Sequence, residues 1–130
     1  MSYFETVREY LSELDLAITH EDSEGEVFVV ENEDSGIKNL VIACADPILI
    51  MEQHLFELHK TSPDILSSLL KKNRDIISGA FVLDETGKKV IFRDTLALEN
   101  LDLNELEGSI NSLELLLSEY SNEIIKFSKN

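Results

Sequence analysis

The order in which helical and strand-like patterns follow one another most constrains the fold of this 130-residue sequence. A helical pattern comes first, then three strand patterns, and then a second helix, a β-hairpin and a long helix. Strands that cluster in runs, apart from the helices, are typical of α+β domains. We therefore predict one α+β domain over residues 1–130, an antiparallel sheet flanked by helices in the order α-β-β-β-α-β-β-α.

The expected first helix runs from Ser2 to Leu14. Ser2 and Glu5 have the spacing of a capping box, in which each side chain accepts a backbone N–H of the other residue. The apolar residues of this segment recur at helical spacing. They are Tyr3, Phe4, Val7, Tyr10, Leu11 and Leu14. This pattern predicts a helix with one face on the core.

Two strands are expected at residues 26–32 and 37–45, because both segments are rich in β-branched side chains. The turn Glu33–Gly36 separates them. A weaker strand signal lies at Ala17–Thr19. The acidic run of residues 21–26 reads as a charged edge, which discourages pairing between sheets.

The segment from Ile48 to Leu58 fits two patterns. A helix would align Ile48, Met51, Leu55 and Leu58. A strand interrupted by Glu52 would align Ile48, Ile50, His54, Phe56 and Leu58. Periodicity alone does not decide between the two. We interpret the segment as a strand.

A second helix is expected after Ser62–Pro63, because a capping residue followed by proline is typical of a helix start. This helix should end near Asn73–Asp75. Residues 80–83 and 88–92 flank the turn Asp84–Gly87, whose residue types favour a tight reversal of the chain. The sequence therefore predicts a β-hairpin here.

The last helix should run from Leu103 to Phe127, with Asp102 as its cap. Its apolar residues alternate spacings of three and four, as in a heptad repeat. They are Leu103, Leu106, Ile110, Leu113, Leu117, Tyr120, Ile124 and Phe127. Leu116 widens this stripe, which favours a helix that lies on a sheet over a free coiled coil.

The charge balance narrows the range of partners. The chain carries 26 acidic and 11 basic side chains, which gives a net charge of −15. This excess repels nucleic-acid phosphates and anionic membrane surfaces, and it favours solubility or basic partners. One cysteine excludes an internal disulfide, and we see neither a signal peptide nor an apolar span of about 18 residues. We expect a cytoplasmic protein.

The candidates for chemistry are few, and each has a simpler explanation. Glu52 and His54 would share a strand face and could hold a metal loosely, but a partly exposed His is the favoured interpretation. Residues 31–36 resemble a calcium loop, but Ile42 stands where a bidentate Glu is required. Cys44 lies among apolar residues, which favours a buried structural role. We therefore predict no catalytic residues, metal or cofactor, and no enzyme.

The basic cluster Lys71–Arg74 lies near the end of the second expected helix, where positive charge complements the helix dipole. An exposed site for an acidic partner is the alternative that the sequence leaves open.

One stretch of the chain resembles a known family. It comprises Leu69–Arg74 and Gly79–Asp84, followed by Gly87, Val90, Asp94 and Leu96 and then the closing leucine-rich helix. The element order resembles the type III secretion chaperone fold, and the residues are more specifically similar to the YbjN family, which shares that fold. Small proteins described as Tir-chaperone-like are similar as well. This likeness also favours a strand for residues 48–58.

The resemblance implies a small acidic homodimer that binds a segment of another polypeptide, whose identity is unknown. By the same analogy, the second helix and the hairpin form the dimer interface. The interface residues expected from it are Leu66, Leu69, Leu70, Phe81 and Leu83. Leu69→Asp should then split the dimer.

Two other hypotheses stay open at this point. One is a regulatory or stress-related adaptor of the same fold without a secretion client. The other is a small-ligand or metal binder, which would need a concave pocket with several convergent polar groups.

Overall fold

The computed structural model describes residues 2–129. Within them the chain forms three α-helices, two short 3-10 helices and six strands. In chain order these are α1 (Tyr3–Glu13), β1 (Ala17–Asp22), β2 (Val27–Asn32), η1 (Glu33–Ser35), β3 (Ile37–Ala45), β4 (Ile48–Glu57), α2 (Pro63–Lys72), η2 (Asn73–Asp75), β5 (Ala80–Leu83), β6 (Lys89–Ala97) and α3 (Leu103–Lys129). The predicted α+β class is confirmed, and the sheet holds one strand more than predicted.

The additional strand is β1, where the sequence carries only a weak signal. It pairs antiparallel with β2 between Ala17–Glu31 and Asp22–Val27, and the register shifts between Ile18 and His20. Ile18 is its one half-buried residue, and the others are exposed. Because an exposed edge strand buries so little, its sequence lacks the alternation that marks a half-buried strand.

All neighbouring strands are antiparallel, in the order β1-β2-β3-β4-β6-β5. The ambiguous segment is the central strand β4, so its interpretation as a strand is confirmed. Leu49, Met51 and Gln53 of β4 point to the core, and then the register shifts between His54 and Phe56. This bulge returns Phe56 to the buried face, which explains why no single period fits the segment.

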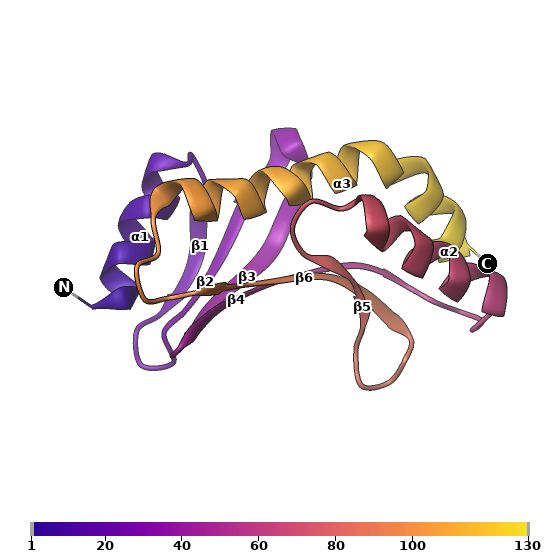
Figure 1. Ribbon diagram of the computed structural model, residues 1–130, viewed down its shortest axis with the longest axis horizontal. Coiled ribbons are helices and arrows are strands. Elements are labelled where there is room, and N and C mark those ends of the chain that lie inside the picture. Colours follow the sequence, from indigo (N-terminus) through magenta and orange to yellow (C-terminus); the bar gives the residue numbers. More distant parts are fainter. Residues whose placement is uncertain (1, 130) are drawn as a thin grey trace.

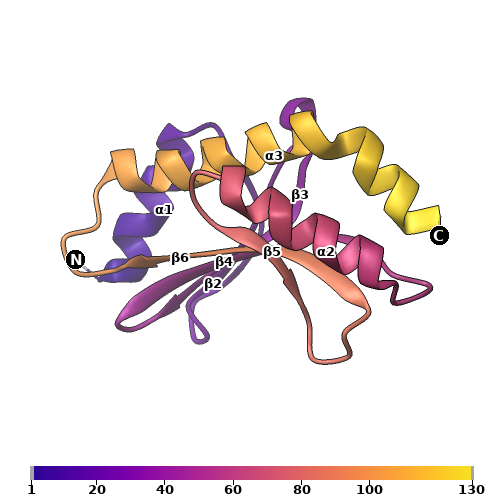
Figure 2. The same ribbon diagram turned by 45° about the vertical axis from the view of Figure 1, so that its right-hand side comes forward.

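All three α-helices lie on one side of the sheet, with α3 running across it and α1 and α2 near its two ends (Figure 1). The view turned by 45° shows the same arrangement (Figure 2). The largest fully buried side chains come from both layers: Phe28, Phe92, Leu11, Ile37, Leu40, Ile42, Leu49, Met51, Leu98, Leu106, Leu113 and Leu116. The core therefore lies between one layer of helices and one face of the sheet.

The predicted helix starts are confirmed in two cases. Ser2 and Glu5 form the capping box of α1. Asp102 accepts the backbone N–H of Glu105 over 2.8 Å at the start of α3. Ser62 precedes Pro63 as predicted, but its side chain makes no capping hydrogen bond. Leu116 is buried, as expected for a widened stripe that lies on a sheet.

Candidate protein-binding surfaces

The metal hypothesis finds no support in the arrangement of side chains. Glu52 and His54 share a sheet face, but the Glu52 carboxylate accepts a hydrogen bond from Arg93 over 2.9 Å. Residues 2–129 contain no group of three or more His, Cys, Asp or Glu side chains that could hold a metal ion. The Glu52 carboxylate therefore serves an ion pair across two strands.

Cys44 is 8% exposed, as predicted for a structural cysteine. Burial and, to a smaller degree, the charge of Glu26 raise the pKa of its thiol to about 11. The thiol is therefore protonated at neutral pH, which makes it a weak nucleophile.

The side of the sheet opposite to the helices is uncovered within the described chain, and we call it the open face. Cross-strand pairing places apolar residues of neighbouring strands side by side on it. They are Val27, Val29, Val41, Ala43, Ala45, Ile48, Ile50, Val82, Ile91 and Ala97. Most of them are half-buried, and Val41 is 38% exposed.

At one end of the sheet the central strands are apolar on both faces, and the Glu52–Arg93 ion pair lies further along the open face. In β4, Leu49 points to the core while Ile48 and Ile50 point to the open face. In β2, Phe28 is buried and Val27 lies opposite. Strands of this composition are typical of sheets that are covered on both sides. The helices of this chain cover one side only, so the open face has the composition of a surface that binds a partner.

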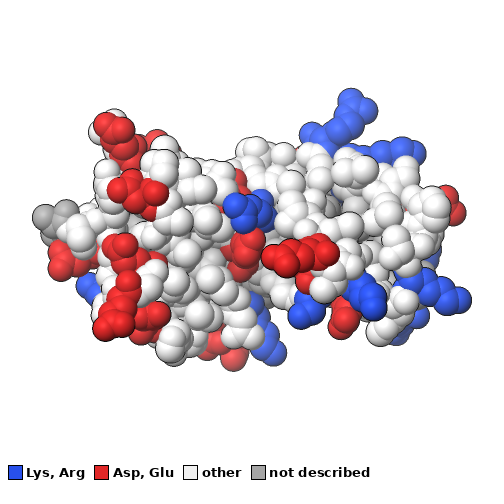
Figure 3. Space-filling view, turned by 90° about the horizontal axis from the view of Figure 1, so that it is seen from below, with Lys and Arg blue, Asp and Glu red and all other residues white. Residues whose placement is uncertain are grey.

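Charge is distributed unevenly over the molecule. Residues 1–57 hold 14 acidic and two basic side chains, whereas residues 58–97 hold five acidic and seven basic ones. Seen from the open face, acidic groups gather at the left-hand end, near α1 and the first hairpins, and basic groups are spread toward the right (Figure 3). A partner on this face would therefore meet an apolar floor with an acidic end.

Three further exposed apolar side chains come from α2, the loop that follows it and β5. They are Leu70, Ile77 and Leu83, which are 69%, 82% and 42% exposed, and we call them the α2–β5 patch. Of the other residues predicted for a dimer interface, Leu69 and Phe81 are each 5% exposed and belong to the core of the protomer. Leu66 is half-buried against that core.

Hydrogen bonds hold the loop that carries Ile77. The Asn73 side chain donates to the Phe81 carbonyl over 3.2 Å and accepts the Phe81 N–H over 2.8 Å, so it occupies the free edge of β5. At the other end of the loop, the Ser78 N–H donates to the Ser112 hydroxyl over 3.1 Å. Ile77 is therefore held outward by a fixed backbone.

Further hydrogen bonds below this loop involve Asp94 of β6. Its carboxylate accepts hydrogen bonds from the hydroxyls of Ser78 and Ser109, which joins the loop to α3. The half-buried carboxylate is thereby solvated by hydroxyl groups in place of water.

The basic cluster divides between two roles. The Lys72 ammonium lies 3.3 Å from the Glu123 carboxylate and within 6 Å of the Tyr120 and Phe127 ring centres. Lys72 of α2 therefore contacts the second half of α3 and has a structural role. Lys71 and Arg74 are exposed.

Sequence reasoning missed the open face, Ile77 and the edge contact of Asn73. The open face could have been predicted from the sequence. An unbroken apolar run such as residues 48–51 indicates a strand with two apolar faces. The exposure of Ile77 and the pairing of Asn73 with Phe81 depend on the path of the 73–79 loop, which local patterns do not reveal.

None of the helices among residues 2–129 is long and apolar enough to cross a membrane.

The fold has close counterparts among solved structures. YbjN, a proposed transcription regulator from E. coli, superposes with a TM-score of 0.69 at 14% identity, over 92% of this chain and 91% of that one. The type III secretion chaperone SycH of Yersinia pestis, solved with a fragment of YscM2, gives 0.60 at 19% identity over 98% and 100%. The HopA1–SchA chaperone–effector complex gives 0.62 at 15% identity over 98% and 94%.

At the level of sequence, no curated protein is similar enough to count as a match. A family model does match, and it extends over residues 1–130. The chain belongs to the CesT_Tir_1 family, the family of type III secretion chaperones.

Proposed function

We propose that this protein is a non-enzymatic, cytoplasmic homodimer that binds a segment of another polypeptide on the open face of its sheet. The observation that carries the proposal is the apolar group that Val27, Val29, Val41, Ala43, Ile48 and Ile50 form on the side of the sheet that the helices leave uncovered. An apolar sheet face of this extent on a soluble domain is typical of an interaction surface.

The structural relatives support a polypeptide as the partner. SchA was solved with HopA1 in a chaperone–effector complex, and SycH with a fragment of YscM2. At 15% and 19% identity the likeness carries only the fold to this chain. The proposal that this protein binds a polypeptide client therefore depends on the composition of its own open face.

The α2–β5 patch is the proposed dimer interface. A two-fold contact places the same patch of both copies together, so exposed Leu70, Ile77 and Leu83 would cover one another. Leu66, Leu69 and Phe81, predicted from the sequence, would support this surface from below. Side chains alternate along β5, so Leu83 of the patch and Val82 of the open face point to opposite sides of this strand.

The similarity to YbjN favours a second candidate function, a regulatory adaptor of the same fold without a secretion client. Both functions use the same surfaces and differ in the partner. A secretion operon around the gene would favour the chaperone, and its absence would favour the adaptor.

The client proposal is tested with a permanently unfolded probe, reduced and carboxymethylated lysozyme. Val41→Glu places a charge on the open face, and Ile125→Glu places the same charge on α3, where the side chain is 53% exposed. We expect Val41→Glu to weaken binding about tenfold, because a charge in an apolar contact loses its hydration.

Binding is measured by fluorescence anisotropy of the labelled probe, and circular dichroism confirms that both variants are folded. Equal binding by the two variants would remove the open face as the client surface. Failure of the unmodified protein to bind the probe would remove the polypeptide-binding function itself.

The dimer is tested with Leu70→Asp, because Leu70 is exposed in the protomer. The Leu69→Asp exchange predicted from the sequence is less suitable, since Leu69 is buried and its loss would unfold the protomer. Light scattering should give the mass of one chain for Leu70→Asp and of two chains for Ile125→Asp. A two-chain mass for both variants would contradict the proposed interface.

A further inference from the structure

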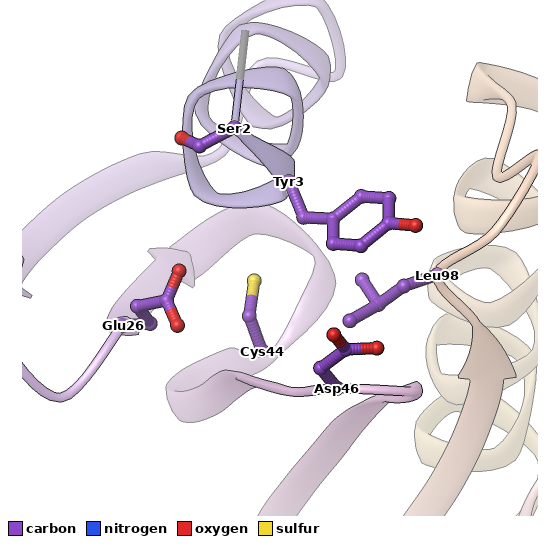
Figure 4. A pocket seen from close by; sticks show the side chains of 6 residues that line it. All are labelled: Ser2, Tyr3, Glu26, Cys44, Asp46 and Leu98. Atoms are coloured by element: carbon purple, nitrogen blue, oxygen red, sulfur yellow. The ribbon is translucent and has the colours of Figure 1, made fainter.

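A cavity of about 290 Å³ lies between the start of α1 and the end of the sheet below it. Its walls are Ser2, Tyr3, Glu26, Cys44, Asp46 and Leu98. Figure 4 shows Glu26 and Asp46 on either side of Cys44, whose thiol points toward the start of α1. The cavity is formed by segments that are far apart in the sequence.

Backbone hydrogen bonds hold these segments together. The Cys44 N–H donates to the Glu26 carbonyl over 2.9 Å, which joins the start of β2 to the end of β3. The Leu98 N–H donates to the Pro47 carbonyl over 3.0 Å, which joins the end of β6 to the β3–β4 turn. Glu26 and Asp46 are thus presented from two neighbouring hairpins at one end of the sheet.

The lining carries two carboxylates and no basic side chain. Two basic residues occur among residues 1–57, and one of them, Arg8, is paired with Glu21 over 2.7 Å. The positive end of the α1 dipole is already compensated, because the Glu5 carboxylate accepts the Ser2 N–H within the capping box. The described charged side chains that line the cavity are therefore acidic and not basic.

The remaining walls suit the stem of a long side chain. Tyr3 is 42% exposed, and the buried residues Leu98 and Cys44 form an apolar floor. The Cys44 thiol makes no hydrogen bond within the described residues and points into the space. Carboxylates beside an aromatic ring and an apolar floor match the head and methylenes of arginine or lysine.

We propose that this cavity binds the cationic side chain of an arginine or lysine in the partner polypeptide. The inference rests on the proposed function and names the chemistry of its client. It also adds a second contact site to the open face, because the cavity lies on the helical side of the sheet.

The strands connect the two surfaces. Side chains alternate along a strand, so Ala45 and Ala97 lie on the open face while Cys44, Asp46 and Leu98 line the cavity. A segment that crosses the open face at this end therefore reaches the cavity by passing round the end of the sheet.

A second cavity adds a requirement on the client. It measures about 160 Å³ and shares Tyr3 and Leu98 with the first, and Val7 and Leu101 add to its apolar wall. The client segment is thus expected to carry an apolar side chain close to its basic one.

The test uses two end-capped peptides, acetyl-Ala-Arg-Ala-Leu-Ala-amide and the same peptide with citrulline, which has the shape of arginine without its charge. Each is titrated into the ¹⁵N-labelled full chain and followed by NMR. We expect the arginine peptide to bind about tenfold more tightly. Its largest shifts should fall on the amides of Glu26, Cys44 and Asp46.

Two double variants separate the cavity from the general acidity of the protein. E26Q/D46N removes both carboxylates of the cavity. E24Q/D34N removes two exposed carboxylates outside it and changes the net charge equally. We expect the first to abolish the preference for arginine over citrulline and the second to retain it.

Equal affinity for the two peptides overturns the inference, as does an equal loss of preference in both double variants. Shifts confined to the open face would also overturn it while leaving the proposed function intact. Failure of the proposed function has a separate readout, the absence of binding to unfolded lysozyme.

Discussion

Strands β1 and β5 are the two edges of one sheet, and the chain protects them differently. At β5, the side-chain amide of Asn73 takes both outward backbone groups of Phe81. At β1, the backbone pairing contains a bulge, and the strand ends in an acidic turn. Its contact with α1 is an ion pair between exposed parts of Arg8 and Glu21. One edge is closed by hydrogen bonds, and the other is guarded by charge and irregularity.

This difference separates the two proposed contacts. A dimer interface requires the α2–β5 patch to have one fixed shape in both copies, and the hydrogen-bonded loop provides it. A client surface must accept a segment of variable sequence, and the acidic end offers long-range attraction with few fixed partners. The two ends should therefore respond differently to equivalent substitutions.

Substitutions of glycines near the two edges should show the largest difference in folding stability. Gly79 has φ +81°, and a Cβ there would lie 2.6 Å from the Phe92 ring. A Cβ on Gly25 would meet the carboxylate of Asp22 at 2.7 Å, the end of a flexible side chain that accepts two backbone N–H groups of the turn. We expect Gly79→Ala to cost about 3 kcal/mol or more and Gly25→Ala about 1 kcal/mol or less, because rigid neighbours cannot yield.

Urea unfolding followed by circular dichroism measures both values, and Gly87→Ala is the control for backbone strain. Gly87 has φ +73° with no atom near its Cβ position. Similar losses for Gly79→Ala and Gly25→Ala would show that the two ends are equally adaptable.

Asn73→Ala should cost about 2 kcal/mol, because two hydrogen bonds to the β5 edge are lost. The opened edge should also allow pairing between copies, which light scattering would detect as a mass that rises with concentration. Asn111→Ala, on an exposed site of α3, is the control and should change stability by less than about 0.5 kcal/mol. Equal stability and mass for the two variants would show that Asn73 does not protect the edge.

Sequence patterns predicted the fold where each element buries a regular stripe. The capping box at Ser2, the hairpin around Asp84–Gly87 and the leucine-rich stripe of α3 are all present. Strand β1, for which the sequence carries only a weak signal at Ala17–Thr19, buries almost nothing and so shows no clear alternation. Residues 48–58 were ambiguous because a bulge interrupts the alternation.

The candidate surfaces were less predictable because they arise between segments. Of the residues predicted for a dimer interface, Leu70 and Leu83 are exposed in the protomer, whereas Leu69 and Phe81 are buried in it. The cavity at the start of α1 combines Tyr3, Glu26, Asp46 and Leu98. No local pattern brings these positions together, since their proximity depends on the strand order.

The reactivity of the Cys44 thiol is a measure of the negative charge at the acidic end of the molecule. Its pKa of about 11 reflects burial first and the charge of Glu26 second. Glu26→Gln should lower this pKa and accelerate alkylation by iodoacetamide at pH 9 a few-fold, since the thiolate is the reactive form. Burial remains in the variant, so the pKa should stay above its usual value of 9.0. An unchanged rate would show that the Glu26 carboxylate is too well solvated to affect the pKa of the Cys44 thiol.

The smallest effect is expected at the exposed pair that joins β1 to α1. The hydrogen bond from Arg8 lowers the pKa of Glu21 below its usual value of 4.5. A carboxylate with a depressed pKa in the folded state stabilises the fold above the unfolded value, and this stabilisation disappears as pH falls through the folded value. The stability difference between the unmodified protein and Glu21→Gln should therefore be present at pH 7, decline below pH 4.5 and shrink in high salt. Urea midpoints measured at pH 7 and pH 3 test this expectation. A difference that persists at pH 3 would mean that Glu21 holds β1 by packing and not by charge, and the β1 edge would then resemble the β5 edge more closely than its exposure suggests.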